Sequence, residues 1–316
     1  MQLAPIILFT YSRPEHTLHT LDSLAQNQFA KDSQLYIFCD GPKTFKTFEA
    51  NRKVQEVIIA EKNRKRFGCV NIAISQENKG LARSIITGVS YVMEKHGECI
   101  VIEDDLILGN NFLGFMNSCL EFYKGNSSIW SISGFTYPLP SLAQYPHDVY
   151  LSYRACSHGW ASWSDRWEKV DWEVKDFETI QHSWSIQRKF NRGGNDLYRM
   201  LCHQMKGERD SWAIRFCYSQ FKNDMLCVYP KIPLVKNVGY DGSGTHCPKQ
   251  SHQANYSIQN DGRELKPENV TLNKTLLKEF KRQYSITPLE AINWGVGKLR
   301  KIFTRIKKFF NRRGIR

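Results

Sequence analysis

Hydrophobic and polar positions alternate along the first hundred residues with two different periods. Four short apolar runs have the length and composition of buried strands: 4–10, 34–39, 70–75 and 98–102. Between them, three segments space their apolar residues as amphipathic helices do: 14–27, 45–66 and 80–95. Strands that alternate with helical crossovers predict an α/β fold, with a mixed, mainly parallel sheet flanked by helices.

The pattern changes after residue 109. Further helices and strands are expected at 111–123, 129–134, 210–221 and 226–235. The segment from His158 to Trp172 is rich in aromatic residues. Residues 250–285 are polar and weakly patterned, so no element is predicted there.

Carboxylates stand directly after two of the predicted strands. Asp40 follows the second strand, and Glu103, Asp104 and Asp105 follow the fourth. In a parallel α/β sheet the carboxyl ends of the strands meet at one edge, where ligands bind. Three adjacent carboxylates repel one another unless a cation compensates them, and Mg²⁺ or Mn²⁺ is the simplest such cation. The triplet therefore predicts a metal site, with a solvated acidic turn that caps the next helix as the alternative.

Positive charge is concentrated near residue 316. The sequence carries a formal net charge of +13 at pH 7, and nine basic residues with no acidic one lie between Gly295 and Arg316. The apolar residues of 294–316 recur at spacings of three and four, which predicts a basic amphipathic helix. Such a helix suits an anionic membrane surface. A helix docked on the protein's own core is the alternative. No nucleic-acid-binding motif accompanies the basic residues, so no nucleic-acid partner is expected.

Other features narrow the class of protein. No apolar run reaches the roughly 18 residues that indicate a membrane-spanning helix. The first ten residues lack the basic start and the cleavage site of a signal peptide. The nine cysteines are scattered, without CxxC or Cys/His zinc spacing, which favours buried free thiols in a reducing compartment. We therefore expect a cytoplasmic protein.

A series of short motifs resembles a known family. The motifs are Tyr-Ser-Arg-Pro (11–14), Phe-Cys-Asp-Gly (38–41), Glu-Asn-Lys-Gly-Leu (77–81) and Glu-Asp-Asp (103–105). In this order they resemble GT-A nucleotide-sugar glycosyltransferases, specifically the alpha-mannoside N-acetylglucosaminyltransferase I type and its bacterial relatives. The resemblance continues to Gly244-Thr245-His246 and covers about residues 4–248.

The resemblance and the patterns beyond it predict a division of the chain. By the resemblance, residues 1–248 would form the GT-A domain, with a donor-binding half at about 1–108 and an acceptor-side half at about 109–248. Outside the resemblance, residues 249–293 would be a polar extension, and the charge pattern makes residues 294–316 the membrane-associating helix.

The resemblance also implies roles at the donor site. Asp105 would ligate the metal that bridges the donor diphosphate. Glu103 and Asp104 would hold the ribose and the sugar, or orient that ligand. Asp40 would bond to the nucleobase, and Arg13 would face the base or the phosphates.

Three other residues are candidates for the same pocket. Lys79 and Arg83 lie beside the Glu-Asn-Lys-Gly-Leu turn, with a solvated helix face as the alternative for both. His246 follows a glycine-rich loop and could reach the diphosphate or complete the metal shell. A histidine satisfied by the backbone is the alternative there.

An inverting transfer also needs a general base to take the proton of the attacking hydroxyl. The family places a carboxylate pair before a tryptophan, and this chain has Asp-Ser at that point. Asp210 is the candidate base, with a helix N-cap as its alternative role. Asp165 and Asp171 are outside alternatives. Trp160 and Trp163 are candidates for stacking on a sugar, with core packing as the alternative.

Together these features predict a metal-dependent, inverting transferase. It would move a hexose or N-acetylhexosamine from a nucleotide sugar, a UDP-sugar by resemblance, to a glycan or lipid-linked acceptor in surface polysaccharide synthesis. The basic helix would hold it at the inner face of the membrane as a peripheral protein. Two alternatives stay open: a sugar-phosphate nucleotidyltransferase, and a non-catalytic membrane-surface binding module on a transferase scaffold. The segment Thr10–Pro14 is unlike the Gly-rich phosphate loop of the first, and the retained acidic triplet argues against the second.

Overall fold

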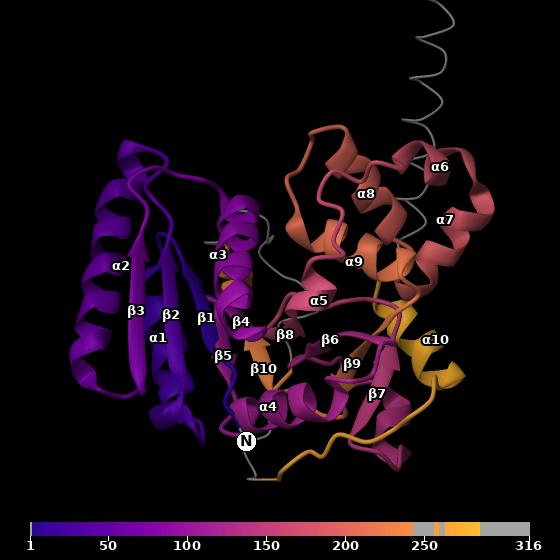
Figure 1. The fold of residues 1–316 in the computed structure, drawn as a ribbon, viewed down its shortest axis with the longest axis horizontal. Coiled ribbons are helices and arrows are strands. Elements are labelled where there is room, and N and C mark those ends of the chain that lie inside the picture. Colours follow the sequence, from indigo (N-terminus) through magenta and orange to yellow (C-terminus); the bar gives the residue numbers. More distant parts are fainter. Residues whose placement is uncertain (1, 243–255, 259–262, 285–316) are drawn as a thin grey trace, which may run out of the picture.

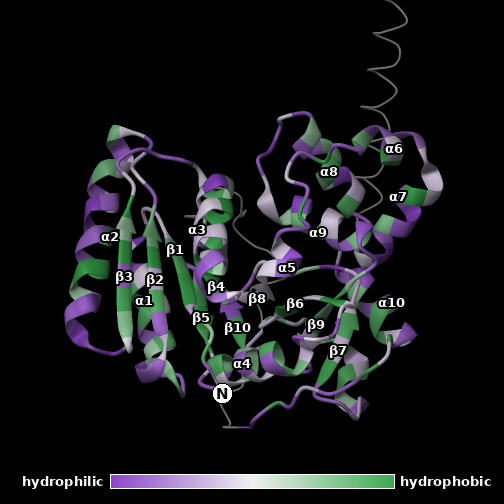
Figure 2. Cartoon of the chain, viewed as in Figure 1, coloured by the Kyte–Doolittle hydropathy of each residue, from purple (hydrophilic) through white to green (hydrophobic). Residues whose placement is uncertain are grey.

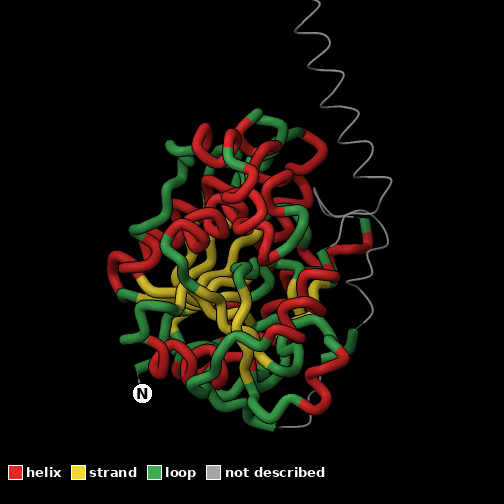
Figure 3. Tube along the Cα trace, turned by 90° about the vertical axis from the view of Figure 1, so that its right-hand side faces the viewer, coloured by secondary structure: helices red, strands yellow, loops and turns green. Residues whose placement is uncertain are grey.

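An eight-stranded mixed sheet forms the centre of the molecule. The computed structural model describes residues 2–242, 256–258 and 263–284. The strand order is β3-β2-β1-β4-β8-β6-β9-β7, and Figures 1 and 3 show these strands between layers of helices. The strands are β1 (Ile6–Thr10), β2 (Gln34–Cys39), β3 (Cys69–Ile74), β4 (Glu98–Glu103), β6 (Ile129–Ser133), β7 (Val149–Ser152), β8 (Trp160–Trp163) and β9 (Leu226–Pro230).

Most strands of this sheet share one direction. β1 is parallel to both β2 and β4, and β2 is parallel to β3. β8 is antiparallel to β4 and β6, β9 is parallel to β6, and β7 is antiparallel to β9. Among these strands, β7 and β8 therefore run against the others, which confirms the expected mixed, mainly parallel α/β sheet. A separate antiparallel pair joins β5 (Leu106–Leu108) to β10 (Val235–Asn237).

Helices cover both faces of the sheet. They are α1 (Pro14–Ala25), α2 (Phe45–Arg64), α3 (Leu81–His96), α4 (Phe112–Tyr123), α5 (Ser164–Trp167), α6 (Phe177–His182), α7 (Trp184–Phe190), α8 (Leu197–Met205), α9 (Trp212–Lys222) and α10 (Lys274–Gln283). On one face, α1, α2 and α4 bury their apolar residues against alternate residues of the strands, such as Ile6 and Leu8. On the other, α3, α5 and α9 pack on the intervening residues, such as Ile7 and Phe9. Figure 2 shows the hydrophobic strands between these helices.

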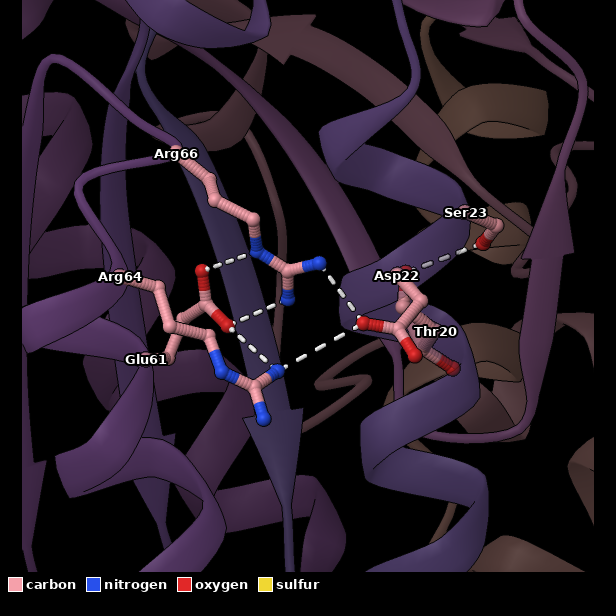
Figure 4. A network of polar contacts seen from close by, with 6 residues as sticks. All are labelled: Thr20, Asp22, Ser23, Glu61, Arg64 and Arg66. Carbon is pink, nitrogen blue, oxygen red and sulfur yellow. Dashed lines mark hydrogen bonds and ion pairs between the residues drawn. The ribbon is translucent and has the colours of Figure 1, made fainter.

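A buried ion network fixes α1 to the end of α2. Glu61 is fully buried, and Arg66 donates hydrogen bonds to both of its carboxylate oxygens. Arg66 also donates to Asp22 Oδ1 on α1, at 2.7 Å. Arg64 lies within ion-pair distance of both carboxylates, as Figure 4 shows. The two arginines thus compensate a carboxylate that would be costly to bury alone.

The predicted elements of the first hundred residues are confirmed within a few residues at each end. Two expectations for the later part were wrong. The single strand expected at 226–235 is two strands, β9 and β10, in two different sheets. The segment 250–285 contains α10, whose Leu276 and Phe280 are each 1% exposed in an aromatic core with Tyr150 and Tyr229.

Two further expectations concern the organisation of the chain. The main sheet continues across residue 109, because β4 pairs directly with β8. The predicted basic helix at 294–316 lies outside the described residues. Within the described part of the chain, none of the helices has the length and apolar character needed to cross a membrane.

Candidate functional site

Three parallel strands deliver polar residues to one edge of the sheet. Arg13 follows β1 and precedes Pro14, the first residue of α1. Asp40 follows β2, and its backbone N–H donates to Thr10 O at 3.0 Å. Glu103 is the last residue of β4, and Asp104 and Asp105 form the turn that follows it. Because β1, β2 and β4 are parallel neighbours, their carboxyl ends place these groups together, at the edge where open α/β sheets bind ligands.

Arg13 supplies a positive charge to the acidic triplet. Its guanidinium forms an ion pair with Asp104 through Nη2, and Nη1 lies 3.1 Å from Asp105 Oδ2. The side chain of Arg13 is 19% exposed and that of Asp104 is 5% exposed. Thr20 on α1 donates from Oγ1 to the Asp104 carbonyl at 2.9 Å, which ties the helix to the same turn. Arg13 is therefore a cation beside the triplet that the sequence analysis did not assign to it.

The compensation by Arg13 is incomplete. Burial, together with the charges of Asp105 and Asp104, raises the pKa of Glu103 to about 8 against the opposing effect of Arg13. Burial also raises the pKa of Asp104, although Arg13 acts in the opposite direction. For Arg13 itself, burial lowers the pKa, but the two aspartates outweigh that effect and raise it. A neutral Glu103 at pH 7 leaves two carboxylates facing one guanidinium.

One carboxylate oxygen of the triplet lacks a partner. Asp104 Oδ2 is buried without a hydrogen-bond partner, and Asp105 contacts Arg13 through Oδ2. In the described ranges no three His, Cys, Asp or Glu side chains are grouped to hold a metal ion. The two aspartates fit an ion that is held by one or two carboxylates and shared with substrate phosphates, which is a common mode for Mg²⁺.

Gly239 lies directly against the ion pair between Arg13 and Asp105. A Cβ at this position would overlap Asp105 Oδ2 and lie 3.0 Å from Arg13 Nη1. The neighbouring Val238 N–H donates to the Asp105 carbonyl at 2.8 Å. Sequence analysis missed Gly239 because it belongs to a loop far beyond the triplet in the chain, and only the pairing of β5 with β10 brings the two segments together.

The Asp40 carboxylate is occupied by the protein itself. Its Oδ1 accepts from the backbone N–H groups of Gly41 and Lys79, at 3.0 and 2.9 Å. Its Oδ2 accepts from the Gly80 N–H and from Asn78 Nδ2, at 2.9 and 3.0 Å. Asp40 thus holds the loop after β3 against the end of β2. The expected bond to a nucleobase would have to compete with these four contacts.

The other donor-side candidates lie at the rim or outside the described residues. Lys79 contributes its backbone N–H to Asp40, and its side chain is exposed. Arg83 is exposed on the first turn of α3. His246 lies outside the described residues.

The three candidate bases are exposed or already paired. Asp210 precedes α9, its side chain is 67% exposed, and it accepts from Arg215 Nη2 at 2.7 Å. Ser211, not Asp210, is the N-cap of α9, since its side chain accepts from the Ile214 N–H. Asp165 is 58% exposed and pairs with Arg166. Asp171 accepts the backbone N–H groups of residues 173–175.

Trp160 and Trp163 do not face a sugar site, and the stacking hypothesis is corrected here. Their exposures are 1% and 2%. The Trp160 ring stacks on Trp167 and Trp212, with centroid distances of 5.7 and 5.1 Å. Trp163 packs in the opposite core, with the Arg166 guanidinium 4.5 Å from its ring centroid. The structure therefore buries both tryptophans of β8 in cores on the two sides of the sheet.

His158 is a residue of this edge that sequence analysis missed. It precedes β8, which runs against β4, so the start of β8 lies at the same edge as the end of β4. Its Nδ1 is buried without a hydrogen-bond partner, and its ring packs edge-on against Phe135, with centroids 5.3 Å apart. Burial lowers the pKa of His158, the charge of Asp105 raises it, and that of Arg154 lowers it. The sequence signal was a histidine at the start of the aromatic-rich segment 158–172.

No protein-family model matches this chain. No curated protein matches it either. Among solved structures, S. aureus TarS 1–349 is 11% identical, with 72% of this chain and 60% of that chain covered and a TM-score of 0.41. The match therefore spans less than two thirds of that protein. A complex of the same protein with UDP is 14% identical, with 42% and 34% covered and a TM-score of 0.31.

Two other solved structures are similar over more of their own length. The mannosyltransferase PcManGT from Pyrobaculum calidifontis, in complex with GDP-Man and Mn²⁺, is 12% identical, with 70% of each chain covered and a TM-score of 0.38. The galactosyltransferase LgtC, with donor and acceptor sugar analogues, is 10% identical, with 71% of this chain and 72% of that chain covered and a TM-score of 0.36. Because the identities and TM-scores are this low, these similarities carry no argument about function, and the residues of the site have to carry it.

Proposed function

We propose that this chain is a glycosyltransferase that transfers a sugar from a nucleotide-sugar donor to an acceptor hydroxyl. The observation that carries the proposal is the group at the carboxyl edge of β1 and β4, where Arg13 faces Asp104 and Asp105 and one oxygen of Asp104 is left without a hydrogen-bond partner. The motifs that contain these residues are those that resemble GT-A transferases, with the N-acetylglucosaminyltransferase I type as the specific relative.

The charge of this edge favours a diphosphate accompanied by a divalent ion. A diphosphate alone would be repelled by two carboxylates that share a single arginine. Mn²⁺ or Mg²⁺, held by Asp105 with Asp104 beside it, would offset that repulsion and stabilise the negative charge of the departing nucleoside diphosphate. Arg13 would keep Asp105 oriented from one side. Gly239 permits the close approach of Asp105, since a Cβ at this position would overlap its carboxylate.

The second part of the reaction is the attack by the acceptor. Its hydroxyl oxygen would attack the anomeric carbon while the bond to the diphosphate breaks, and a base would take the hydroxyl proton. Asp210 is our candidate base, and inversion at the anomeric carbon is the predicted outcome. The Asp210 carboxylate is bonded to Arg215, so its approach to an acceptor would involve a change of partner or of position.

Donor assays test the proposal directly. The full chain is incubated with a panel of UDP- and GDP-sugars, with Mn²⁺ or with EDTA, and release of the nucleoside diphosphate is measured. We expect release from at least one UDP-sugar with Mn²⁺, none with EDTA, and a loss of at least about 100-fold in Asp105→Asn. Turnover unchanged in Asp105→Asn would contradict the role of the triplet. Release of pyrophosphate from a nucleoside triphosphate and a sugar phosphate would identify a nucleotidyltransferase instead.

A second assay separates donor binding from transfer. Asp210→Asn should still bind the donor and should lose transfer to acceptors by at least about 100-fold, the usual lower range for a general base. Transfer at the wild-type rate would assign the base to another residue. Glu168→Gln, an exposed glutamate after α5, is a matched control.

The acceptor is proposed to be a glycan or lipid-linked sugar of a surface polysaccharide. The basis is the basic segment 294–316, which would bring the protein to the anionic inner face of a membrane as a peripheral enzyme. An acceptor at that surface would meet the active edge without leaving the membrane.

A further inference from the structure

A cavity of about 180 Å³ is lined in part by His158, which lies at the sheet edge that carries the candidate donor site. The loop before β8, the helices α8 and α9, and the residue that follows α10 line it as well. Its lining includes Tyr137, Arg154, His158, Met200, Ala213 and Tyr284. The cavity is smaller than the roughly 300–1,000 Å³ of sites for drug-sized ligands, so it suits one small ring rather than an extended chain.

The lining combines apolar and polar residues. Met200 on α8 and Ala213 on α9 are apolar, and Arg154, Tyr137 and His158 are polar. A pyranose ring has a similar combination, with C–H groups on its faces and hydroxyls at its edge.

Arg154 is held in place by its neighbours. Arg154 forms two hydrogen bonds to Asp196, at 2.8 and 3.0 Å, and its guanidinium lies 3.7 Å from the centroid of the Tyr284 ring. The charge of Arg154 is therefore already neutralised by Asp196. A neutral hydroxylated ligand suits such a wall better than an anion does, because an anion would add a second negative group beside Asp196.

His158 connects the cavity with the acidic triplet. It lines the cavity, and the charge of Asp105 acts on its ring. Its Nδ1 is buried and has no hydrogen-bond partner among the described residues. A buried ring nitrogen without a partner is costly unless a ligand or water bonds to it. Because His158 lines the cavity, a molecule bound there is a candidate for that partner.

We propose that this cavity binds the terminal sugar ring of the acceptor, and that His158 forms a hydrogen bond with one of its hydroxyls. The identification of this sugar as an acceptor rests on the proposed transferase function. Binding of a neutral sugar ring to the cavity can be measured without assuming that function. His158 is then a residue of the acceptor site, distinct from the residues that hold the donor.

The experiment measures sugar binding and transfer separately. Saturation-transfer NMR detects binding of a panel of methyl glycosides (glucose, galactose, mannose and N-acetylglucosamine) to the full chain without a donor. Ala213→Leu enlarges a side chain that lines the cavity and should weaken binding of the glycoside about tenfold or more, since the leucine would occupy space that the sugar ring needs. His158→Phe keeps an aromatic ring against Phe135 and should weaken it about threefold to tenfold, the effect of one lost neutral hydrogen bond.

The controls distinguish the two proposals. Ala60→Leu makes the same change on an exposed position of α2 and should bind the glycosides as the wild type does. With a donor present, Ala213→Leu and His158→Phe should raise the KM for the acceptor by the same factors, and thermal melting checks that they fold. Equal glycoside binding in Ala213→Leu and wild type, or no binding of any glycoside to the wild type, would overturn the acceptor cavity. Glycoside binding without turnover of any nucleotide sugar would instead contradict the transferase function and leave a sugar-binding cavity.

Discussion

The Arg13 guanidinium lies 3.1 Å from Asp105 Oδ2 and also forms an ion pair with Asp104, so one side chain bridges two members of the acidic triplet. This contact joins the start of α1 to the turn after β4, and Arg13 and Asp104 are 91 positions apart in the sequence. It makes Arg13 both a structural cation and a neighbour of the proposed donor diphosphate.

Removal of Arg13 should destabilise the fold. In Arg13→Ala, the carboxylate of Asp104 would remain buried without its partner, which typically lowers the free energy of unfolding by about 3–5 kcal/mol. Arg13→Lys should lose less, because it keeps the charge but not the two-pronged contact. Urea denaturation followed by circular dichroism measures both. Arg52→Ala, which removes a solvent-exposed pair with Glu49 and Glu56, is the control and should cause a much smaller change. Equal losses in Arg13→Ala and Arg52→Ala would contradict the bridging role.

Glu103 should make stability depend on pH. The pKa of Glu103 is about 8 in the folded protein, above the ordinary value of 4.5. The folded state therefore keeps a proton that the unfolded state has released, so this contribution is fully present below about pH 4.5 and is lost as pH rises towards 8. Glu103→Gln, which is always neutral, should be more stable than wild type at pH 8, and the difference should shrink at pH 5. Urea unfolding at both values tests this, with the exposed Glu94→Gln as control. A difference between Glu103→Gln and wild type that does not change with pH would show that Glu103 is charged in the folded protein.

Asp40 should act through the loop that it anchors. Asp40→Asn replaces one of the two accepting oxygens by an amide NH₂ group, which cannot accept a hydrogen bond. If Oδ2 is replaced, the contacts with Gly80 and Asn78 are lost. If Oδ1 is replaced, the contacts with Gly41 and Lys79 are lost. Hydrogen bonds to a charged group are worth about 1.5–3 kcal/mol each, and we expect a loss in that range. Hydrogen exchange at the Lys79 and Gly80 amides should accelerate more than exchange at residues of α4. Unchanged protection of these two amides would mean that the loop is held by other contacts.

Trp160 should contribute stability and not sugar recognition. Trp160→Ala should lower the free energy of unfolding by about 3–5 kcal/mol, the usual cost of deleting a buried aromatic ring. Trp184, which is 70% exposed on α7, is the matched control, and Trp184→Ala should stay within about 0.5 kcal/mol of wild type. The milder Trp160→Phe should retain the KM for the acceptor. A raised KM in a variant of normal stability would restore the stacking hypothesis for Trp160.

The basic segment 294–316 should mediate attachment to anionic membranes. Charge reversal tests this without shortening the chain: Lys298, Arg300, Lys301 and Arg305 are changed together to Glu. Each basic residue near an anionic surface contributes about 1 kcal/mol, so this variant should release from vesicles that contain phosphatidylserine. Co-sedimentation measures binding, and activity on a soluble acceptor should be unchanged. Wild-type protein that sediments equally well with neutral vesicles would argue against the electrostatic attachment.

Local patterns determined the elements of the first hundred residues. The run from Gln34 to Cys39 is a strand with the bounds read from the sequence, because its apolar residues and flanking turn suffice to define it. The position of Asp40 and of the acidic triplet at strand ends followed from the same local signals. Since parallel neighbours end at one edge, the meeting of these residues could be predicted as well.

The tertiary structure decided what each side chain contacts. Arg13 as the cation of the triplet, Gly239 against Asp105, and His158 at the shared edge all depend on pairings between distant segments, above all β4 with β8 and β5 with β10. Trp160 and Trp163 look equally suited to a sugar and to a core until the neighbours of β8 on both faces are known. A sequence carries the spacing of residues along the chain, but burial and electrostatic compensation arise only when the sheet order places separate segments in contact.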